Sequence, residues 1–223
     1  MTTRVLILAA GDATRWENHR GTPKHRLIIE DEVLIERTAR QFLKYTNDVV
    51  TVVQKNAHQV EGCSMYVPGQ SRNLKDMAKF MSSQTIWSDD RTVLVFGDTY
   101  FTDEAVETIM SDTQQWRFYL RKEGSTVTGK GWREIFGLSF DASFNKDMNK
   151  AILEVISKNI AFRTGGWFLF MHLLKTEDND KLFTTDDHIN IDDWTEDFDF
   201  PKDLDTWEEK RMAWLKKQKK AKK

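Results

Sequence analysis

Residues 5–16 read VLILAAGDATRW, an apolar run that ends abruptly in two alanines and a glycine. Continuous branched apolar residues are typical of a parallel strand that is buried on both faces. Small residues at the end of such a strand let the backbone approach a ligand, and their free N–H groups make a concavity that binds anions. We therefore predict a buried strand that ends at an anion site.

Two cations bracket this loop, Arg15 inside the quoted stretch and Lys24 beyond it. A polyphosphate suits such a pair, because its charge is spread over several oxygens and needs several donors. The alternative is that both side chains are ordinary surface charges of a loop. Their position around a strand-end glycine favours the anion site.

The rest of the chain alternates apolar β-branched runs with segments of helical periodicity. In the first half, strands are predicted over residues 4–8, 49–53 and 92–96, and helices over 32–45, 74–81 and 103–110. This order predicts a doubly wound α/β fold, an open and mostly parallel sheet with helices on both faces. The second half is less regular, with strands expected over 118–120 and 134–140 and helices over 146–158, 167–174 and 202–217.

The size and composition of the chain indicate one domain. Its 223 residues, 39% of them apolar, are enough for one sizeable core. No Pro- or Gly-rich linker divides it, so we predict a single domain over residues 1–217, followed by a basic tail over 218–223. Cys63 is the only cysteine in the sequence, which excludes an internal disulfide framework.

Charge and hydropathy indicate which kinds of partner, such as a membrane or a nucleic acid, the chain is expected to bind. The charged fraction is 30%, and no apolar run approaches the roughly 20 residues of a membrane helix. We recognise no signal peptide, so we expect a cytoplasmic protein without a membrane partner. The lysine-rich end KKQKKAKK, on a chain with a net charge of −2, is weak support for a nucleic-acid partner. The sequence leaves a homodimer open.

Three motifs carry a resemblance to a known family. The sequence contains neither G-x-G-x-x-G nor G-x-x-x-x-G-K-[ST], but LAAGDATRW, TPKHRL and LIERTARQF follow one another. Together they resemble the signature of GT-A-like nucleotidyltransferases, which include sugar-phosphate nucleotidyltransferases, cytidylyltransferases and the molybdenum-cofactor guanylyltransferase. The resemblance implies magnesium-dependent transfer of a nucleoside monophosphate from an NTP to a phosphorylated acceptor, such as a sugar phosphate, with release of pyrophosphate.

The resemblance also implies roles for residues of the first half. It divides the domain into an NTP-binding half over residues 1–115 and an acceptor-binding half over 116–217. Arg15 and Lys24 match the cations that neutralise the phosphates, and they are the catalytic candidates. A helix N-cap at Ser71 would explain the segment around Gly69 equally well. The expected nucleotide site contains Leu8, Ala9, Ala10, Gly11, Arg15, Lys24, Gly69, Arg72 and Asp98.

A further motif, VLVFGDTYF over residues 93–101, ends a strand with Asp98. In the family that the chain resembles, the acid at this strand end binds magnesium, which takes one or two protein carboxylates. The second carboxylate is expected from TEDFDFPKDLDTW, residues 195–207, where Asp199 matches and Asp197 is the alternative. Asp98 could instead cap the next helix, but Thr102 is better placed for that role.

The residues expected to bind the acceptor are predicted from a looser match to the family motifs. The segment GKGWREIFGLSF, residues 129–140, resembles a Glu-x-x-Gly motif near the acceptor, which gives Glu134 and Gly137. Lys130 is a candidate for an acceptor phosphate, and Trp167 is a candidate for stacking on a sugar ring. An exposed lysine and a core tryptophan would explain the same two residues.

Two other functions fit the same fold class. A glycosyltransferase with a nucleotide-sugar donor would need a D-x-D metal motif, and GDTYF lacks its second acid. A nucleotide-binding protein without turnover is disfavoured, because both Asp98 and Asp199 are retained.

Overall fold

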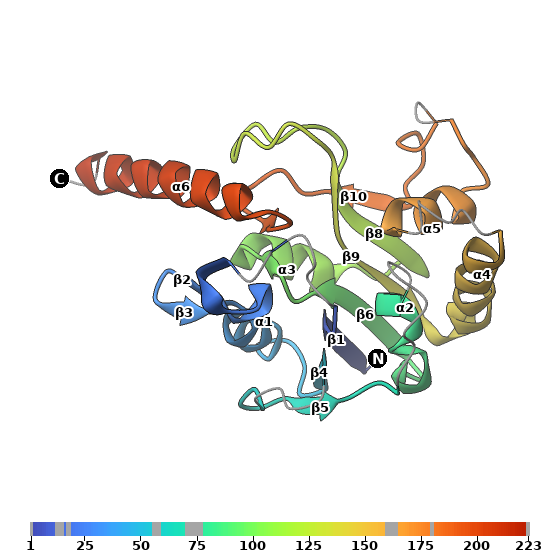
Figure 1. The fold of residues 1–223 in the computed structure, drawn as a ribbon. Helices are drawn as coiled ribbons and strands as arrows, with labels where there is room; N and C mark the ends of the chain where they lie inside the picture. Colours follow the sequence, from blue (N-terminus) through green and yellow to red (C-terminus); the bar gives the residue numbers. More distant parts are fainter. Residues whose placement is uncertain are drawn as a thin grey trace.

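The computed structural model of the chain describes residues 2–11, 16, 19–54, 59–69, 78–158, 165–178 and 181–221 (Figure 1). A seven-stranded sheet with the strand order β10-β8-β9-β6-β1-β4-β5 runs through its centre. Two short pairs, β2 with β3 and β7 with β11, lie outside this sheet. The strands are β1 (Thr3–Ala9), β2 (Ile28–Ile29), β3 (Glu32–Val33), β4 (Val49–Val53), β5 (Ser64–Tyr66), β6 (Arg91–Phe96), β7 (Thr99–Tyr100), β8 (Trp116–Arg121), β9 (Glu134–Asp141), β10 (His188–Asn190) and β11 (Glu196–Asp197).

All strands of the large sheet run in one direction except β9. β1 pairs in parallel with β4 and β6, β5 pairs in parallel with β4, and β10 does so with β8. β9 is antiparallel to both of its neighbours, β6 and β8. The predicted, mostly parallel sheet is therefore confirmed. Because parallel strands end at one edge, the segments that follow β1, β4, β5 and β6 meet along the same side of the sheet.

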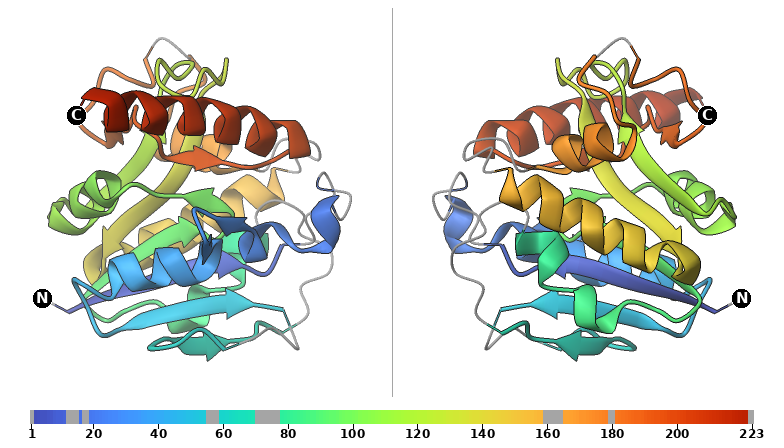
Figure 2. Two further views of the ribbon diagram at one scale, coloured as in Figure 1. Left: turned by 90° about the vertical axis from the view of Figure 1, so that its left-hand side faces the viewer. Right: turned by 90° about the vertical axis from the view of Figure 1, so that its right-hand side faces the viewer.

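Helices cover both faces of the sheet, as the two side views show (Figure 2). On one face, α1 (Leu34–Phe42) and α3 (Asp103–Ser111) share a core with Val5 and Ile7 of β1. On the other face, α2 (Ala78–Met81), α4 (Asn145–Ser157) and α5 (Gly166–Leu173) share a core with Leu6 and Leu8. Successive side chains of β1 thus enter opposite cores, which explains its continuous apolar run and confirms the doubly wound fold.

β9 contains a bulge near its start. The register with β8 shifts after Tyr119, so that Phe136 is an extra residue on β9. An extra residue changes the face to which the neighbouring side chains point. Ile135 and Leu138 accordingly share one core cluster, although they are three residues apart, while Phe136 lies in the cluster on the opposite face. The bulge follows directly on Glu134, one of the predicted site residues.

The structure differs from the sequence predictions mainly in short elements. The helix expected over residues 32–45 begins at Leu34, because Glu32 and Val33 pair with β2 in a small hairpin. The strands β7, β10 and β11 were not predicted. Only α2, at the end of the helix expected over residues 74–81, falls within the described part of that segment.

The last helix, α6 (Pro201–Ala221), projects beyond the sheet, with the C-terminus at its far end (Figure 1). Its N-terminal part joins a third core cluster, where Leu204 and Trp207 pack with Trp16, Leu27 and other residues. The helix continues into the lysine-rich tail without a break, and residues 216–220 are exposed. Within the described parts of the chain, no helix is both long and apolar enough to cross a membrane.

Candidate active site

The glycine loop lies at the carboxyl edge of the sheet, where the sequence predicts the nucleotide. Leu8 and Ala9 end β1 as buried residues, and Ala10 and Gly11 follow them. The Gly97 N–H donates to the Leu8 carbonyl at 2.9 Å, which holds the segment after β6 against the end of β1. A Cβ added at Gly97 would lie 2.9 Å from the Ala9 Cβ, so this close approach requires a glycine.

Neighbouring strands add residues to the same edge. Gln54, just after β4, donates its side-chain amide to the carbonyls of Ala10 at 3.2 Å and Gly11 at 3.4 Å. The sequence analysis missed this residue, although its place at the end of an apolar run was a usable signal. Gly69 follows β5 and is exposed. Arg15 and Arg72, the two predicted arginines, lie outside the described residues.

Lys24 begins a short 3-10 helix, Lys24–Arg26, and its side chain is buried beside two carboxylates. Its Nζ lies 2.6 Å from Asp98 Oδ2 and 3.4 Å from Asp199 Oδ1. Burial opposes the charge on Lys24, but the carboxylates of Asp98, Asp197 and Asp199 outweigh this effect and raise its pKa. The predicted phosphate-binding lysine and the two predicted metal-binding acids therefore meet at one point.

The pairing of β7 with β11 brings these acids together from distant parts of the sequence. β7 begins directly after Asp98, and β11 ends two residues before Asp199. Asp197 pairs with Thr99 in this antiparallel ladder, and the Phe198 N–H donates to the Asp98 carbonyl at 3.3 Å. Two strands of two residues each thus place both acids beside the end of β6.

The helix that follows Asp98 has its own cap. Thr102 precedes α3, and its side-chain hydroxyl accepts a hydrogen bond from the Ala105 N–H at 3.0 Å. The prediction that Thr102 caps this helix is confirmed. Asp98 is therefore not required for capping, and its side chain faces Lys24 instead.

Three carboxylates, those of Glu134, Asp197 and Asp199, form a cluster next to Lys24. One oxygen of each lies within 4.8 Å of the others. Asp197 is buried, and its Oδ1 has no hydrogen-bond partner among the described residues. An unpaired buried carboxylate is costly, so this oxygen requires a proton or a cation. Carboxylate oxygens are ligands that magnesium prefers, and the residues present therefore fit such an ion.

The electrostatics of the cluster agree with a cation site. Burial, followed by the negative charges of Asp98 and Asp199, raises the pKa of Asp197 well above its ordinary value. Burial also raises the pKa of Glu134, with Lys130 opposing the shift and Asp199 adding to it. A divalent cation would favour the ionised form of both groups. The cluster contains Asp199 and its alternative Asp197, whereas Asp98 is linked to it through Lys24.

The Lys130 side chain is only 6% exposed, and it connects the acidic cluster to the loop before β9. Its Nζ donates to the Asp197 carbonyl at 2.7 Å and forms ion pairs with Glu134 and Glu196, both at 3.3 Å. Asp203 of α6 lies at 3.9 Å. Burial opposes the charge on Lys130, but these carboxylates outweigh it and raise its pKa. The alternative of an exposed lysine is therefore wrong.

A buried ion pair holds β11 in place. The side chains of Arg121 and Glu196 are 1% and 2% exposed, and the guanidinium donates to both carboxylate oxygens, at 2.9 and 3.1 Å. Thr128 donates to the same carboxylate. The sequence analysis missed both partners of this pair. Neither has a local signal, because the two residues are 75 positions apart.

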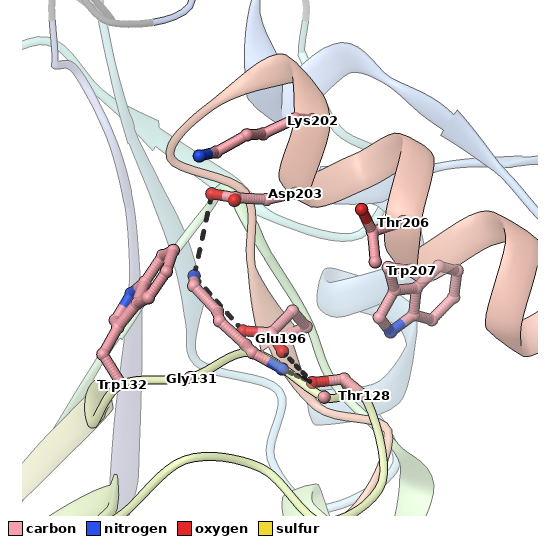
Figure 3. Close-up of a pocket in the computed structure, with 10 residues that line it drawn as sticks. Thr128, Gly131, Trp132, Glu196, Lys202, Asp203, Thr206 and Trp207 are labelled. Carbon is pink, nitrogen blue, oxygen red and sulfur yellow. Dashed lines mark hydrogen bonds and ion pairs between the residues drawn. The ribbon is translucent and has the colours of Figure 1, made fainter.

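A cavity of about 230 Å³ adjoins this network. Figure 3 shows it between the loop that carries Trp132 and the first turns of α6. The Trp132 side chain is 45% exposed, so one side of the cavity is an accessible indole. The lining residues are Thr128, Gly129, Lys130, Gly131, Trp132, Glu196, Lys202, Asp203, Thr206 and Trp207.

The two remaining acceptor candidates do not line this cavity. Trp167 packs against Phe170 at the edge of a core cluster, with the Arg133 guanidinium 5.4 Å from the centre of its ring. Gly137 is buried within β9, where an added Cβ would lie 2.5 Å from the Leu94 carbonyl oxygen. Close packing of two strands is sufficient to explain a glycine at this position.

Comparison with known proteins gives matches in structure only. No family model and no curated protein matches the sequence. The CTP:phosphocholine cytidylyltransferase of Streptococcus pneumoniae is 14% identical, with a TM-score of 0.61 over 94% of this chain and 99% of that chain. An inositol-1-phosphate CTP transferase from T. maritima is 12% identical, with a TM-score of 0.59 over 95% of each chain. A UDP-glucose pyrophosphorylase is 11% identical, with a TM-score of 0.62 over 97% and 100%.

These matches define the class of fold. The chain has the fold of these nucleotidyltransferases over nearly its whole length. The resemblance that the sequence motifs predict is thereby confirmed for the fold. The molecules in the three names differ from one another, so the fold does not define the substrate.

Proposed function

We propose that the protein is a magnesium-dependent nucleotidyltransferase that acts on a small phosphorylated acceptor. A phosphate oxygen of the acceptor attacks the α-phosphorus of an NTP, the bond from this phosphorus to the bridging oxygen of the β-phosphate breaks, and pyrophosphate leaves. A side-chain nucleophile is unnecessary, because the acceptor phosphate is already anionic. Catalysis of this kind consists mainly of positioning and charge stabilisation.

The observation that carries the proposal is the meeting of Lys24 with Asp98 and Asp199 beside the glycine loop. Lys24 Nζ is 2.6 and 3.4 Å from the two carboxylates. A triphosphate and its cation match this pattern of charge, because the lysine attracts phosphate while the acids attract the cation. The fold shared with three nucleotidyltransferases supports the same function.

On the nucleotide side, residues 8–11 receive the triphosphate through their backbone N–H groups, and Lys24 neutralises its charge. Arg15, Gly69 and Arg72 are proposed to complete this side. Asp98 and Asp199 would hold the magnesium, with Asp197 and Glu134 beside them. When bound there, magnesium supplies positive charge to the phosphates and to the oxygen that leaves.

We place the acceptor on the side of Lys130 and Glu134. Lys130 contacts the Asp197 carbonyl and lines the neighbouring cavity, so a molecule in that cavity would lie next to the acidic cluster. Glu134 belongs to the cluster itself. Gly137 and Trp167 remain predictions for this side of the site.

Pyrophosphate release is the test of this function. The protein is incubated with magnesium chloride, each common NTP in turn, and a pool of sugar phosphates, inositol phosphates and phosphocholine. We expect one NTP to give steady release that stops when EDTA is added. The test variant Asp98→Asn should stay folded and lose turnover. The control variant Asp147→Asn, at an exposed acid on α4, should keep both its fold and its turnover.

Two results would contradict the proposal. Full activity in Asp98→Asn would remove Asp98 from the site. No pyrophosphate from any combination of NTP and acceptor, with a folded protein, would exclude the reaction.

A further inference from the structure

The residues that line the cavity beside Trp132 carry equal numbers of positive and negative charges. Its lining contains two lysines, Lys130 and Lys202, and two acids, Glu196 and Asp203. Both oxygens of Glu196 bond to the buried Arg121. The Asp203 carboxylate accepts from the Phe200 N–H at 3.0 Å and lies 3.9 Å from Lys130 Nζ. The acids of the lining thus already have partners within the chain.

The exposed Trp132 indole already contacts a cation within the chain, the Lys130 ammonium. Lys130 Nζ lies 5.3 Å from the centre of the Trp132 ring, within the range of a cation–π contact. A quaternary ammonium ligand binds best on the face of an aromatic ring, with acidic groups nearby. Here the Lys130 ammonium already lies at the ring. Lys202 adds a second positive charge at the cavity (Figure 3).

We propose that Lys130 fills the cation position at Trp132, so that the cavity takes the uncharged, hydroxylated ring of the acceptor and rejects a quaternary ammonium group. This inference rests on the proposed function and specifies the acceptor as a sugar or cyclitol phosphate rather than phosphocholine. The rest of the Trp132 indole supplies a large apolar surface for such a ring. The exposed Thr206 hydroxyl and the backbone of Gly129 and Gly131 offer partners for ring hydroxyls.

The size and position of the cavity agree with this assignment. A volume of about 230 Å³ is below the roughly 300–1,000 Å³ of sites for drug-sized ligands, so it suits one small ring rather than a nucleotide. Lys130 and Glu196 form part of its wall, and Lys130 Nζ also donates to the Asp197 carbonyl at 2.7 Å. A ring in the cavity would therefore have its phosphate next to the acidic cluster.

Direct binding tests the inference independently of turnover. Glucose 1-phosphate, mannose 1-phosphate, myo-inositol 1-phosphate and phosphocholine are titrated separately into the full chain with magnesium chloride, and heat is measured by calorimetry. We expect at least one ring phosphate to bind at least about tenfold more tightly than phosphocholine. Trp132→Ala should weaken that ligand about tenfold, and Trp132→Phe should retain most of the affinity.

The matched control is Trp214→Ala, which removes an exposed tryptophan of α6 that does not line the cavity. Its affinity should equal that of the unchanged protein. Phosphocholine binding as tightly as every ring phosphate, no binding of any ring phosphate, or full affinity in Trp132→Ala would overturn the inference. A failure of the proposed function is distinct, because it would appear as normal ring-phosphate binding without pyrophosphate release.

Discussion

At the scale of single residues, Lys24 is the side chain that most directly links the fold to phosphate chemistry. It is the buried cation between Asp98 and Asp199. We expect Lys24→Ala to lower kcat/KM by about 2–4 kcal/mol, or about 30- to 1,000-fold, as when one donor to a developing anion is lost. Steady-state pyrophosphate release measures this effect. Lys44→Ala, which removes an exposed lysine, should leave the rate unchanged, and equal rates in the two variants would leave Lys24 without this role.

Arg121 shows how burial determines the contribution of an ion pair to the stability of the fold. We expect Arg121→Met to reduce the free energy of unfolding by about 3–5 kcal/mol, because it leaves the buried Glu196 carboxylate without its main partner. Urea denaturation measures the change. Arg40→Met breaks a pair of similar geometry at 2.7 Å, but Arg40 is 52% exposed, so we expect a loss below about 1 kcal/mol. Equal losses in the two variants would contradict the account.

The site residues differ in how far the sequence could predict them. Lys24, Asp98 and Asp199 belong to sequence motifs that resemble those of a known family, so these residues could be predicted as site candidates. Arg121 and Glu196 become partners only when β8 and β11 approach in space, and nothing near either residue in the sequence indicates this. Lys130 was a candidate from the sequence, but its acidic partners could not be predicted, because they come from β9, β11 and α6.

At the scale of elements, β9 and β6 pack so closely that Gly137 has no room for a side chain. A Cβ at this position would lie 2.5 Å from the Leu94 carbonyl, which is a backbone atom within β6. We expect Gly137→Ala to destabilise the protein by about 1–3 kcal/mol, through displacement of one strand. At Gly131 no atom of the described residues lies within 4 Å of an added Cβ, so Gly131→Ala should change the free energy of unfolding by only a few tenths of a kcal/mol, measured by thermal unfolding. Unchanged stability of Gly137→Ala would contradict the packing.

The C-terminal end of α6 should be dispensable. The helix runs to Ala221, but residues 216–220 are exposed, and the core contacts of α6 come from Leu204 and Trp207. We expect deletion of residues 218–223 to leave the melting temperature and pyrophosphate release nearly unchanged. A loss of turnover in the truncated protein would show that these residues contribute to the site. Salt-sensitive binding to DNA or RNA that the truncation abolishes would instead indicate a nucleic-acid partner.

The length and burial of each strand explain whether the sequence could predict it. β1, β4 and β6 are buried on both faces, and their apolar runs are signals strong enough to place them within a residue or two. β7 and β11 have two residues each and exist because they pair with each other. Such strands have no periodicity of their own, so their role in joining Asp98 to Asp199 could be found only in the structure.

At the scale of the whole molecule, one edge of the sheet brings together the groups that the proposed function needs. The glycine loop after β1 and Asp98 after β6 meet there because both strands are parallel. The return of the chain through β11 then adds Asp197 and Asp199, and α6 closes the cavity on the acceptor side. The site therefore combines the regular half of the fold with the less regular half.

The reaction itself is the central claim, and ³¹P NMR tests it most directly. The protein, magnesium chloride, an NTP and a ring phosphate are combined, and the phosphorus resonances are followed with time. The account predicts that free pyrophosphate and a nucleoside diphosphate-linked product appear in equal amounts, only with magnesium and only when Asp98 is intact. An NTP that stays intact with every acceptor, while a nucleotide sugar in a parallel sample is converted to a nucleoside diphosphate, would contradict it and identify a glycosyltransferase.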